Sequence, residues 1–260
     1  MAYTAVQWEK QDGVGVITMN QPANMNALTQ VMADDLLAVL QQAESDPEVK
    51  VIVFTGTGRA FCAGGDISRM REGFDQVSAL DYMDRMQTIT KVWNSLKKPT
   101  IAAVNGAATG AGLSLVLLCD LSVVASNAKL GCAFINMGLA PDFAMAYYLP
   151  RMVGPQRAKE LIYTGRIFMP DEACAMGLIN RVVEPEQLME EAMTLAKKLA
   201  KGATFGMRLA KRMLQISMET DFNTLLNVEG LIQSSAFVTE DSREAVGAFL
   251  DKRKPEFHGK

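Results

Sequence analysis

Two segments rich in glycine and alanine stand out, and each follows a short apolar run of the kind that forms a buried strand. RAFCAGGDI covers residues 59–67 after the run at 51–54, and NGAATGAG covers residues 105–112 after the run at 101–104. Glycine allows positive φ and close approach of a ligand, and amides at a helix start have no intrahelical acceptor. Two such amides that converge form an oxyanion hole, which stabilises a carbonyl oxygen as it becomes an enolate. A second interpretation, in which both segments are only packing turns, stays open.

Proton transfer in this chain must rely on carboxylates, cysteine, tyrosine or lysine. The sequence has one histidine, His258, close to its C-terminal end, so we expect neither a Ser/His/Asp triad nor a histidine proton shuttle. The four cysteines, at positions 62, 119, 132 and 174, form no CxxC pair, and we expect no metal site. GxxxxGK[ST] and a clean GxGxxG are both missing from the sequence, which argues against nucleotide binding through those loops.

Composition narrows the classes of partner. The 260 residues include 26 Lys and Arg against 29 Asp and Glu, a net charge of −3, and this balance argues against a nucleic-acid or anionic-membrane binder. Residues 101–125 are mostly small or apolar, but Asn105 and Asp120 within them favour a strand, turn, helix and strand over a membrane span. The first residues resemble neither a secretory signal nor a transit peptide. We therefore expect a cytoplasmic protein.

The apolar pattern predicts the elements that position the two loops. Residues 6–8 and 14–19 flank Asp12 and Gly13 and read as a hairpin. A helix stripe then runs from Leu28 to near Pro47, followed by a strand at 51–54. The next elements are expected to be one long helical segment at 66–96, strands at 100–104 and 121–125, and a helix at 111–118. Strands that alternate with helices predict a layered α/β core with parallel pairing.

Beyond Pro185 the pattern is helical throughout. Helices are expected at residues 187–200, 204–218, 222–237 and 241–252. We therefore divide the chain into an α/β core at residues 1–185 and a helical oligomerisation region at 186–260, which should pack on the core or on another subunit.

Four segments together resemble the crotonase superfamily, the enoyl-CoA hydratases and isomerases: AFCAGGDI at 60–67, AAVNGAATGAGLSLVLLCDLSVVA at 102–125, GLAPDFAMAYYLPRMVG at 138–154 and MGLINRVVE at 176–184. With FLDKRKPEFHGK at 249–260 the resemblance covers essentially the whole chain. It implies a core of repeated ββα units and a helical C-terminal trimerisation region. It also implies acyl-CoA substrates with no metal or redox cofactor, and a homotrimer or a dimer of trimers.

The resemblance also assigns residues. The thioester oxygen would be held by the amides of Gly65 and Ala111, the latter directly after Gly110. The adenine and pantetheine of CoA would be held by the backbone around Met25, Ala27, Ala63, Asp66 and Ile67. The tail lysines and Phe257 would reach CoA in the same or a neighbouring subunit.

The sequence departs from the family's hydratases at the acid positions. Hydratases use two glutamates on the added water, and this chain has Ser114 and Phe134 at those places. Neither side chain supplies a titrating carboxylate. Asp142, directly after Pro141, occupies the position where isomerases of the family carry an acid. One carboxylate suits isomerisation, because a single base can take a proton from one carbon of a dienolate and return it to another.

We therefore expect an acyl-CoA isomerase with Asp142 as the proton carrier. Two alternatives stay open: a hydratase in which Ser114 positions water and Asp142 acts alone, and an acyl-CoA-binding scaffold. Asp142 could also be a structural turn residue. We expect Asp66 to cap a helix, Asp120 to anchor a strand and Cys62 to be an inert thiol. We expect an apolar wall around Asp142 from Phe134, Met137, Phe143 and Met145. A helical stripe could line an acyl pocket or pack in the core, and it consists of Met70, Phe74, Tyr82, Met83 and Met86.

Overall fold

The computed structural model describes residues 3–260, apart from the side chain of Glu72. Two sheets form its centre. The larger sheet has the order β1-β2-β3-β5-β7-β10, and the smaller one has the order β4-β6-β8-β9. Their strands are β1 (Val6–Gln11), β2 (Val14–Met19), β3 (Val51–Gly56), β4 (Ala60–Cys62), β5 (Thr100–Val104), β6 (Ala107–Thr109), β7 (Leu121–Ala125), β8 (Leu130–Gly131), β9 (Ile167–Phe168) and β10 (Arg181–Val183).

The hairpin expected at the N-terminal end is confirmed. Strands β1 and β2 pair antiparallel, with Gln11 opposite Val14. Asp12 and Gly13 both have positive φ, 53° and 78°, which is the conformation that a two-residue hairpin turn of matching twist requires. The remaining neighbours in the larger sheet pair parallel.

Both faces of the larger sheet are covered, which explains why its central strands are apolar at every position. Along β3, Val51 and Val53 face the cluster that contains helix α8, while Ile52 and Phe54 face the main core. Successive side chains of a strand point to opposite faces, so a strand buried on both sides reads as a continuous apolar run.

Three parallel strands of the larger sheet each continue into a short strand of the smaller sheet before the chain turns into a helix. This happens from β3 to β4, from β5 to β6 and from β7 to β8, and β4, β6 and β8 pair parallel with one another. The expected core of repeated ββα units is thereby confirmed. The short strands escape a periodicity analysis because they are only two or three residues long.

Helices surround this core. They are α1 (Gln30–Ser45), α2 (Ile67–Glu72), α3 (Gln76–Asn94), α4 (Ala111–Leu118), α5 (Met145–Val153), α6 (Pro155–Thr164), α7 (Pro170–Ala175), α8 (Leu188–Ala200), α9 (Thr204–Ser217), α10 (Phe222–Phe237) and α11 (Glu240–Leu250), with 3-10 turns η1 (Pro22–Asn24), η2 (Ala133–Met137) and η3 (Pro185–Gln187). All eight residues of α4 are buried. The expected helix at 111–118 is confirmed, and it is the central helix of the fold.

The single long helix expected at residues 66–96 is wrong, because the segment breaks into α2 and α3. Gly73 ends α2 with a φ of 83°, a conformation that glycine adopts at little cost. Asp75 then caps α3 and forms a capping box with Ser78. The apolar spacing continues across the break, so it does not reveal the new start.

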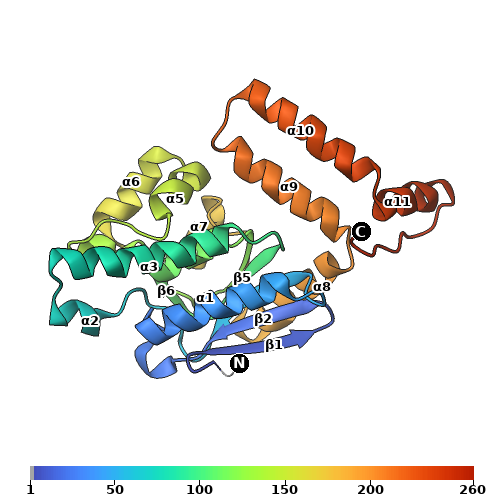
Figure 1. Cartoon of the computed structure of the whole chain (residues 1–260). Coiled ribbons are helices and arrows are strands. Elements are labelled where there is room, and N and C mark those ends of the chain that lie inside the picture. Colours follow the sequence, from blue (N-terminus) through green and yellow to red (C-terminus); the bar gives the residue numbers. More distant parts are fainter. Residues whose placement is uncertain (1–2) are drawn as a thin grey trace.

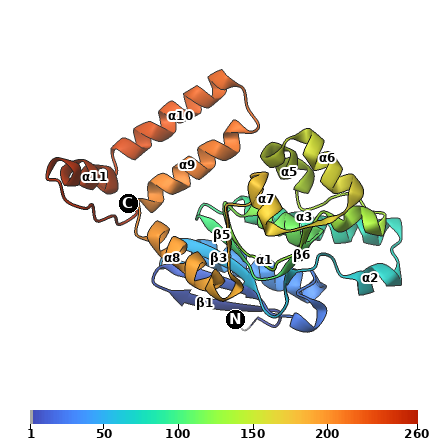
Figure 2. The ribbon, with the colours of Figure 1, turned by 180° about the vertical axis from the view of Figure 1, so that it is seen from behind.

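The C-terminal helices divide into α8, which packs on the core, α9, which is tied to the core by polar contacts, and α10 and α11, which extend away from it (Figure 1). Helix α8 covers the rear face of the sheet (Figure 2) with Leu188, Ala192 and Ala196 buried against it. Lys211 of α9 is paired with Asp120 at 2.8 Å, while α10 and α11 extend away from the sheets (Figure 1). Large apolar side chains on these two helices are exposed, among them Phe222, Leu231, Phe237, Phe249 and Leu250. Within residues 3–260, no helix is long and apolar enough to cross a membrane.

Candidate active site

The two glycine-rich turns lie against each other. Strands β4 and β6 that lead into them pair side by side, and the Thr109 hydroxyl donates to the Ala63 carbonyl at 2.9 Å. A methyl group added to Gly64 would lie 2.9 Å from the Thr109 carbonyl oxygen and 3.7 Å from the Ala111 amide nitrogen. The turns therefore meet in a contact that only glycine permits at position 64.

Each turn presents a free amide beside this contact. Among the residues described, the amides of Gly65 and Ala111 have no backbone acceptor. Ala111 is the first residue of α4, and Gly110 before it adopts φ 55° and ψ −126°, a region that is essentially restricted to glycine. Helix-start amides attract a developing negative charge. The sequence-based pair Gly65 and Ala111 is thus brought together by the fold, although its role as an oxyanion hole stays a prediction.

A cavity of about 1020 Å³ opens on these amides. Its walls come from the loop after β4, helices α2 and α3, the turn before α4, and the segment from η2 to Phe143. Most of the lining is apolar, and the titratable side chains among the described lining residues are Arg71, Tyr82 and Asp142. An apolar cavity with few convergent polar groups is typical of a substrate site.

Asp142 lines this cavity together with Gly65 and Ala111. Its Oδ1 atom is buried and has no hydrogen-bond partner within the described residues. Burial raises the pKa of Asp142 to about 6, since an apolar surrounding disfavours the charged carboxylate. Burial and then the charge of Asp142 also raise the pKa of Tyr82. A carboxyl group with a pKa near neutrality and a free oxygen is equipped to exchange a proton with a bound molecule.

Ser114 is not where a water-positioning group would be needed. Its side chain is fully buried, it does not line the cavity, and its hydroxyl donates to the backbone carbonyl of Asp142 at 3.1 Å. The structure therefore does not place Ser114 on the cavity wall, and its assignment to the substrate-binding set stays a prediction. The sequence does not predict this hydrogen bond, because Ser114 and Asp142 are 28 residues apart and no local pattern links them.

Phe134 and the residues after η2 form one wall. Phe134, Met137 and Phe143 line the cavity, as does Pro141. Two ring atoms of Phe134 lie 4.0 Å from the position that a Cβ atom at Gly110 would occupy, so the ring borders the second turn. Met145 is buried in the core and does not line the cavity, so its place in the expected wall is wrong. It begins α5, which turns the side chain inward.

The residues of the stripe along α2 and α3 are divided between the cavity wall and the core. Met70, Phe74, Tyr82 and Met83 line the cavity, whereas Met86 is buried in the core. Leu28 lines the cavity as well and was not among the expected residues. It forms an isolated bridge with Gly65, a pairing between loops that the sequence gives no sign of.

The expected CoA-binding residues fall into two groups. Ala63, Ile67 and Gly110 line the cavity. Met25, Ala27 and Asp66 do not line it, although the Met25 carbonyl accepts from the Ala63 amide at 3.0 Å and so lies beside the first turn. Whether these three hold CoA outside the cavity stays a prediction.

Three side chains have structural roles, as expected. Asp66 caps α2 by accepting from the Ser68 amide at 2.9 Å. Asp120 accepts from the Thr100 amide at 2.7 Å and from its hydroxyl at 2.9 Å, which ties β5 to the start of β7. Burial raises the pKa of the Cys62 thiol to about 12, so this cysteine is an unreactive thiol at neutral pH.

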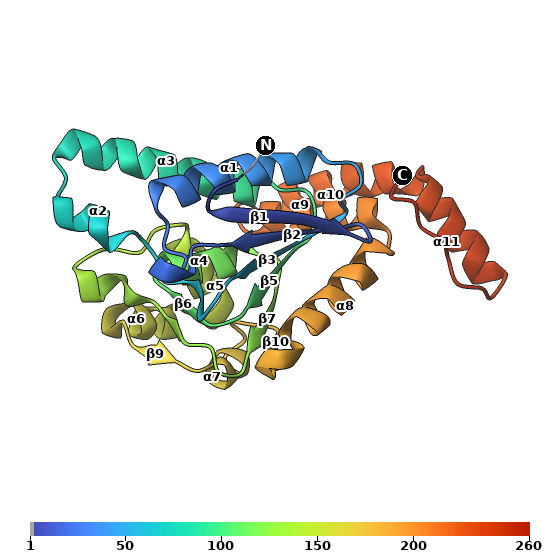
Figure 3. The ribbon, with the colours of Figure 1, turned by 90° about the horizontal axis from the view of Figure 1, so that it is seen from below.

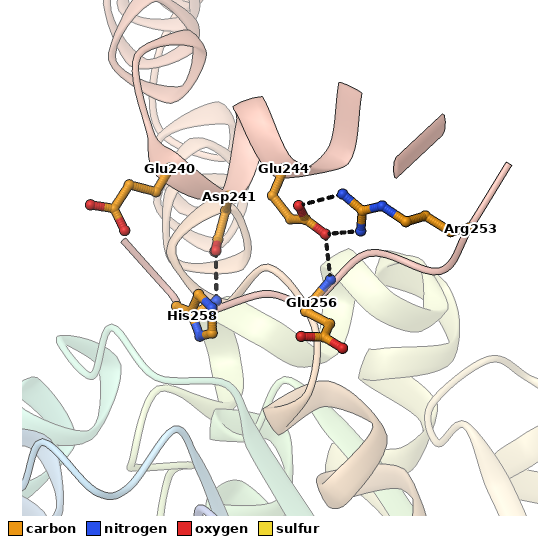
Figure 4. A pocket seen from close by; sticks show the side chains of 6 residues that line it. All are labelled: Glu240, Asp241, Glu244, Arg253, Glu256 and His258. Atoms are coloured by element: carbon orange, nitrogen blue, oxygen red, sulfur yellow. Dashed lines mark hydrogen bonds and ion pairs between the residues drawn. The ribbon is translucent and has the colours of Figure 1, made fainter. Parts of the chain in front are cut away.

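The C-terminal tail bends back onto α11 (Figure 4). Asp241, which is buried, accepts from the amides of His258 at 2.7 Å and Gly259 at 2.9 Å. Glu244 binds Arg253 at 2.6 Å. Helix α11 lies at the opposite end of the molecule from α2 (Figure 3). No tail residue is among the described residues that line the cavity. The expectation that Phe257 reaches CoA in the same or a neighbouring subunit stays a prediction.

Comparison with known proteins defines the class to which this fold and cavity belong. The model of the enoyl-CoA hydratase/isomerase family matches residues 9–260. The chain is therefore a member of the enoyl-CoA hydratase/isomerase family, the crotonase superfamily.

Particular relatives match along nearly their whole length. Crotonyl-CoA hydratase of Syntrophomonas wolfei is 35% identical over 261 residues and covers 100% of both chains. Short-chain-enoyl-CoA hydratase of Clostridium acetobutylicum is 36% identical and covers 95% of both. The crystal structure of an enoyl-CoA hydratase/isomerase from Cupriavidus metallidurans superposes with a TM-score of 0.94 at 32% identity, covering 100% of this chain and 98% of that one.

Proposed function

We propose that the chain acts on an enoyl-CoA thioester whose carbonyl oxygen lies between the amides of Gly65 and Ala111, with Asp142 as the group that transfers the proton. The two amides would stabilise the enolate oxygen more than the ground-state carbonyl. The apolar cavity would take the acyl chain and keep water from the enolate. Family membership supports the substrate class.

Of the two activities in the family's name, the geometry supports isomerisation best. The observation that carries this proposal is the buried, unpartnered Oδ1 of Asp142, whose pKa of about 6 suits both proton removal and proton return. One carboxylate beside an enolate is sufficient to move a double bond, because the proton it takes is the proton it gives back. No second carboxylate lines the cavity among the described residues.

Hydration is the second candidate, and the names of the relatives favour it over isomerisation. The two relatives of Syntrophomonas and Clostridium are both named as hydratases. In this chain Asp142 would have to act alone on the water, because the Ser114 hydroxyl is committed to the Asp142 carbonyl and Phe134 offers no polar atom. Addition of water needs both a base and an acid, so a single carboxylate would have to serve in turn as each.

Assembly would complete the site in this proposal. The exposed apolar side chains of α10 and α11 form a surface that a monomer rarely leaves open to water. Burial between copies in a trimer or a dimer of trimers would cover it. The tail of a neighbouring copy would then be the source of Phe257 and the lysines near CoA.

Two substrates separate the candidates. The purified chain is incubated with a 3-enoyl-CoA and, separately, with a 2-enoyl-CoA, and the products are resolved by chromatography and mass. We expect conversion of the 3-enoyl to the 2-enoyl thioester. Water addition to the 2-enoyl thioester without isomerisation of the 3-enoyl thioester would establish the second candidate instead. Protection by CoA thioesters against thermal unfolding, with no turnover of either, would favour a binding scaffold.

A further inference from the structure

Helix α4 connects the second turn of the site to Asp142. Its first residue is Ala111, and one turn later Ser114 is fully buried. The Ser114 hydroxyl is 3.1 Å from the Asp142 carbonyl oxygen and 3.4 Å from the Gly110 carbonyl oxygen. One hydroxyl proton serves one of the two acceptors well, and the shorter contact is the one to Asp142.

We infer that Ser114 is a positioning residue for Asp142: through this hydrogen bond, helix α4 fixes the carboxyl group at a set distance from the amide of Ala111. This inference rests on the proposed function for its catalytic meaning. It assigns a role to the position at which the family's hydratases would carry a glutamate.

The backbone after Asp142 shows why such an anchor matters. Phe143 and Ala144 both adopt the left-handed region, with φ of 47° and 59°. Residues with a Cβ pay an energetic cost there, and they stay only when surrounding contacts hold them. The Asp142 carbonyl accepts from the Met145 amide at 3.0 Å, which closes the turn from within. The Ser114 hydrogen bond joins this turn to a different, fully buried element, in addition to the burial of Phe143 and Met145 in the core.

The direction of the Asp142 carboxyl group is linked to that anchor. Its Oδ1 has no hydrogen-bond partner within the described residues, so no hydrogen bond to Oδ1 fixes the carboxyl group, and the position of its backbone matters the more. If the turn relaxes, the carboxyl group gains access to water and its distance from the Ala111 amide is no longer fixed. A misplacement of about 1 Å is enough to lower a rate by roughly a hundredfold.

The decisive variant is Ser114→Ala, with Ser114→Thr as the form that keeps the hydroxyl. We expect Ser114→Ala to lower kcat for 3-enoyl-CoA isomerisation about 10- to 100-fold while KM changes less than about twofold, and Ser114→Thr to recover most of the loss. Ser122→Ala is the matched control, since Ser122 is also buried and its hydroxyl bonds Asn180 in another part of the core. Equal kcat in Ser114→Ala and the wild type, or equal losses in Ser114→Ala and Ser122→Ala, would overturn the inference.

A second measurement does not depend on turnover. The pKa of the Asp142 carboxyl is followed by carbon NMR in the wild type and in Ser114→Ala. Arg71 of α2 and Tyr82 of α3 face the same cavity and are unchanged by the substitution, so a change reports on the exposure of Asp142. We expect the pKa to fall by about one pH unit or more toward the ordinary value as water reaches the group.

An unchanged pKa would overturn the inference even if the wild type turned over no thioester. Absence of wild-type turnover would instead contradict the proposed function. If Ser114→Ala fails to fold, Ser114→Cys replaces it, since the thiol is a weak donor of similar size.

Discussion

The hydroxyl of Thr109 donates to the carbonyl of Ala63 at 2.9 Å and so joins the two turns that carry the free amides of the site. Thr109 ends β6, and Ala63 follows β4. The bond lies next to the close contact of Gly64 with the second turn. Its consequence is that the spacing of the Gly65 and Ala111 amides depends on one side-chain hydrogen bond as well as on the strand pairing.

Substitution of Thr109 by valine tests this relationship, because valine keeps the shape and removes the donor. We expect stability to fall by about 1 kcal/mol, the usual net value of one hydrogen bond, and kcat/KM to fall roughly 5- to 10-fold. Chemical denaturation and steady-state kinetics measure the two effects. Thr88→Val removes a hydroxyl hydrogen bond at an exposed position of α3 and should leave kcat/KM unchanged. An equal loss in both variants would contradict the prediction.

Substitution of Gly64 by alanine should disable the site. The added methyl group would meet the Thr109 carbonyl oxygen at 2.9 Å, at a φ of 108° that disfavours alanine. Gly177→Ala is the matched control, because Gly177 also has a positive φ, 76°, but its methyl group would contact nothing within 4 Å. We expect both variants to lose about 1 kcal/mol or more from backbone strain. Only Gly64→Ala should lose kcat by a further factor of about 100, on the scale of a lost oxyanion donor.

Asp142 should also make stability depend on pH. Its pKa is about 6 in the folded chain against 3.8 as the ordinary value, so the folded state binds the proton more tightly than the unfolded state. Ionisation of Asp142 therefore costs stability as pH rises from about 4 to 6, and the cost is complete above that range. We expect Asp142→Asn to be more stable than the wild type by roughly 1 to 3 kcal/mol at pH 8 and by little at pH 4.

Thermal unfolding across pH 4 to 8 measures this difference. Asp84→Asn, at an exposed position of α3, is the control and should follow the wild type throughout. A stability difference between Asp142→Asn and the wild type that is the same at both ends of the range would show that Asp142 is not buried at a raised pKa.

The tail offers a prediction that is independent of catalysis. Asp241 accepts from two tail amides, and hydrogen bonds to a charged acceptor contribute about 1.5 to 3 kcal/mol each. We expect Asp241→Ala to release the tail, which hydrogen exchange at the amides of His258 and Gly259 would report as loss of protection. Asp251→Ala, whose carboxylate is exposed and 3.6 Å from Arg253, should leave that protection intact.

Much of the fold follows from the sequence because its central elements have strong, long apolar patterns. The hairpin, β3, β5, α4, β7 and the four C-terminal helices lie within a few residues of the expected ranges. The break at Gly73 and the short strands of the smaller sheet do not, since a capping box and two-residue strands leave no periodic signal. Helix α8 lies beyond residue 185 and still packs on the sheet. Its alanine-rich apolar stripe alone does not show whether the helix packs on the sheet or on another subunit.

In the candidate site too, the sequence predicts some residues correctly placed on the cavity and misplaces others. Gly65, Ala111 and Asp142 come from motifs and do share one cavity. Ser114 and Met145 were assigned to the site and instead lie behind it, because the direction of a side chain depends on long-range packing that spacing does not encode. The bend of the tail depends on Asp241, seventeen residues before His258, and no local pattern predicts that contact.

The most direct test of the account is the rate at which Asp142→Asn isomerises a 3-enoyl-CoA at pH 8. The amide has nearly the shape of the carboxyl group but cannot take up the proton. We predict that kcat falls about 100- to 10,000-fold, the range of a lost general base, while the affinity for the thioester is unchanged within about threefold. Turnover by Asp142→Asn equal to that of the wild type would contradict the assignment of Asp142 as the proton carrier.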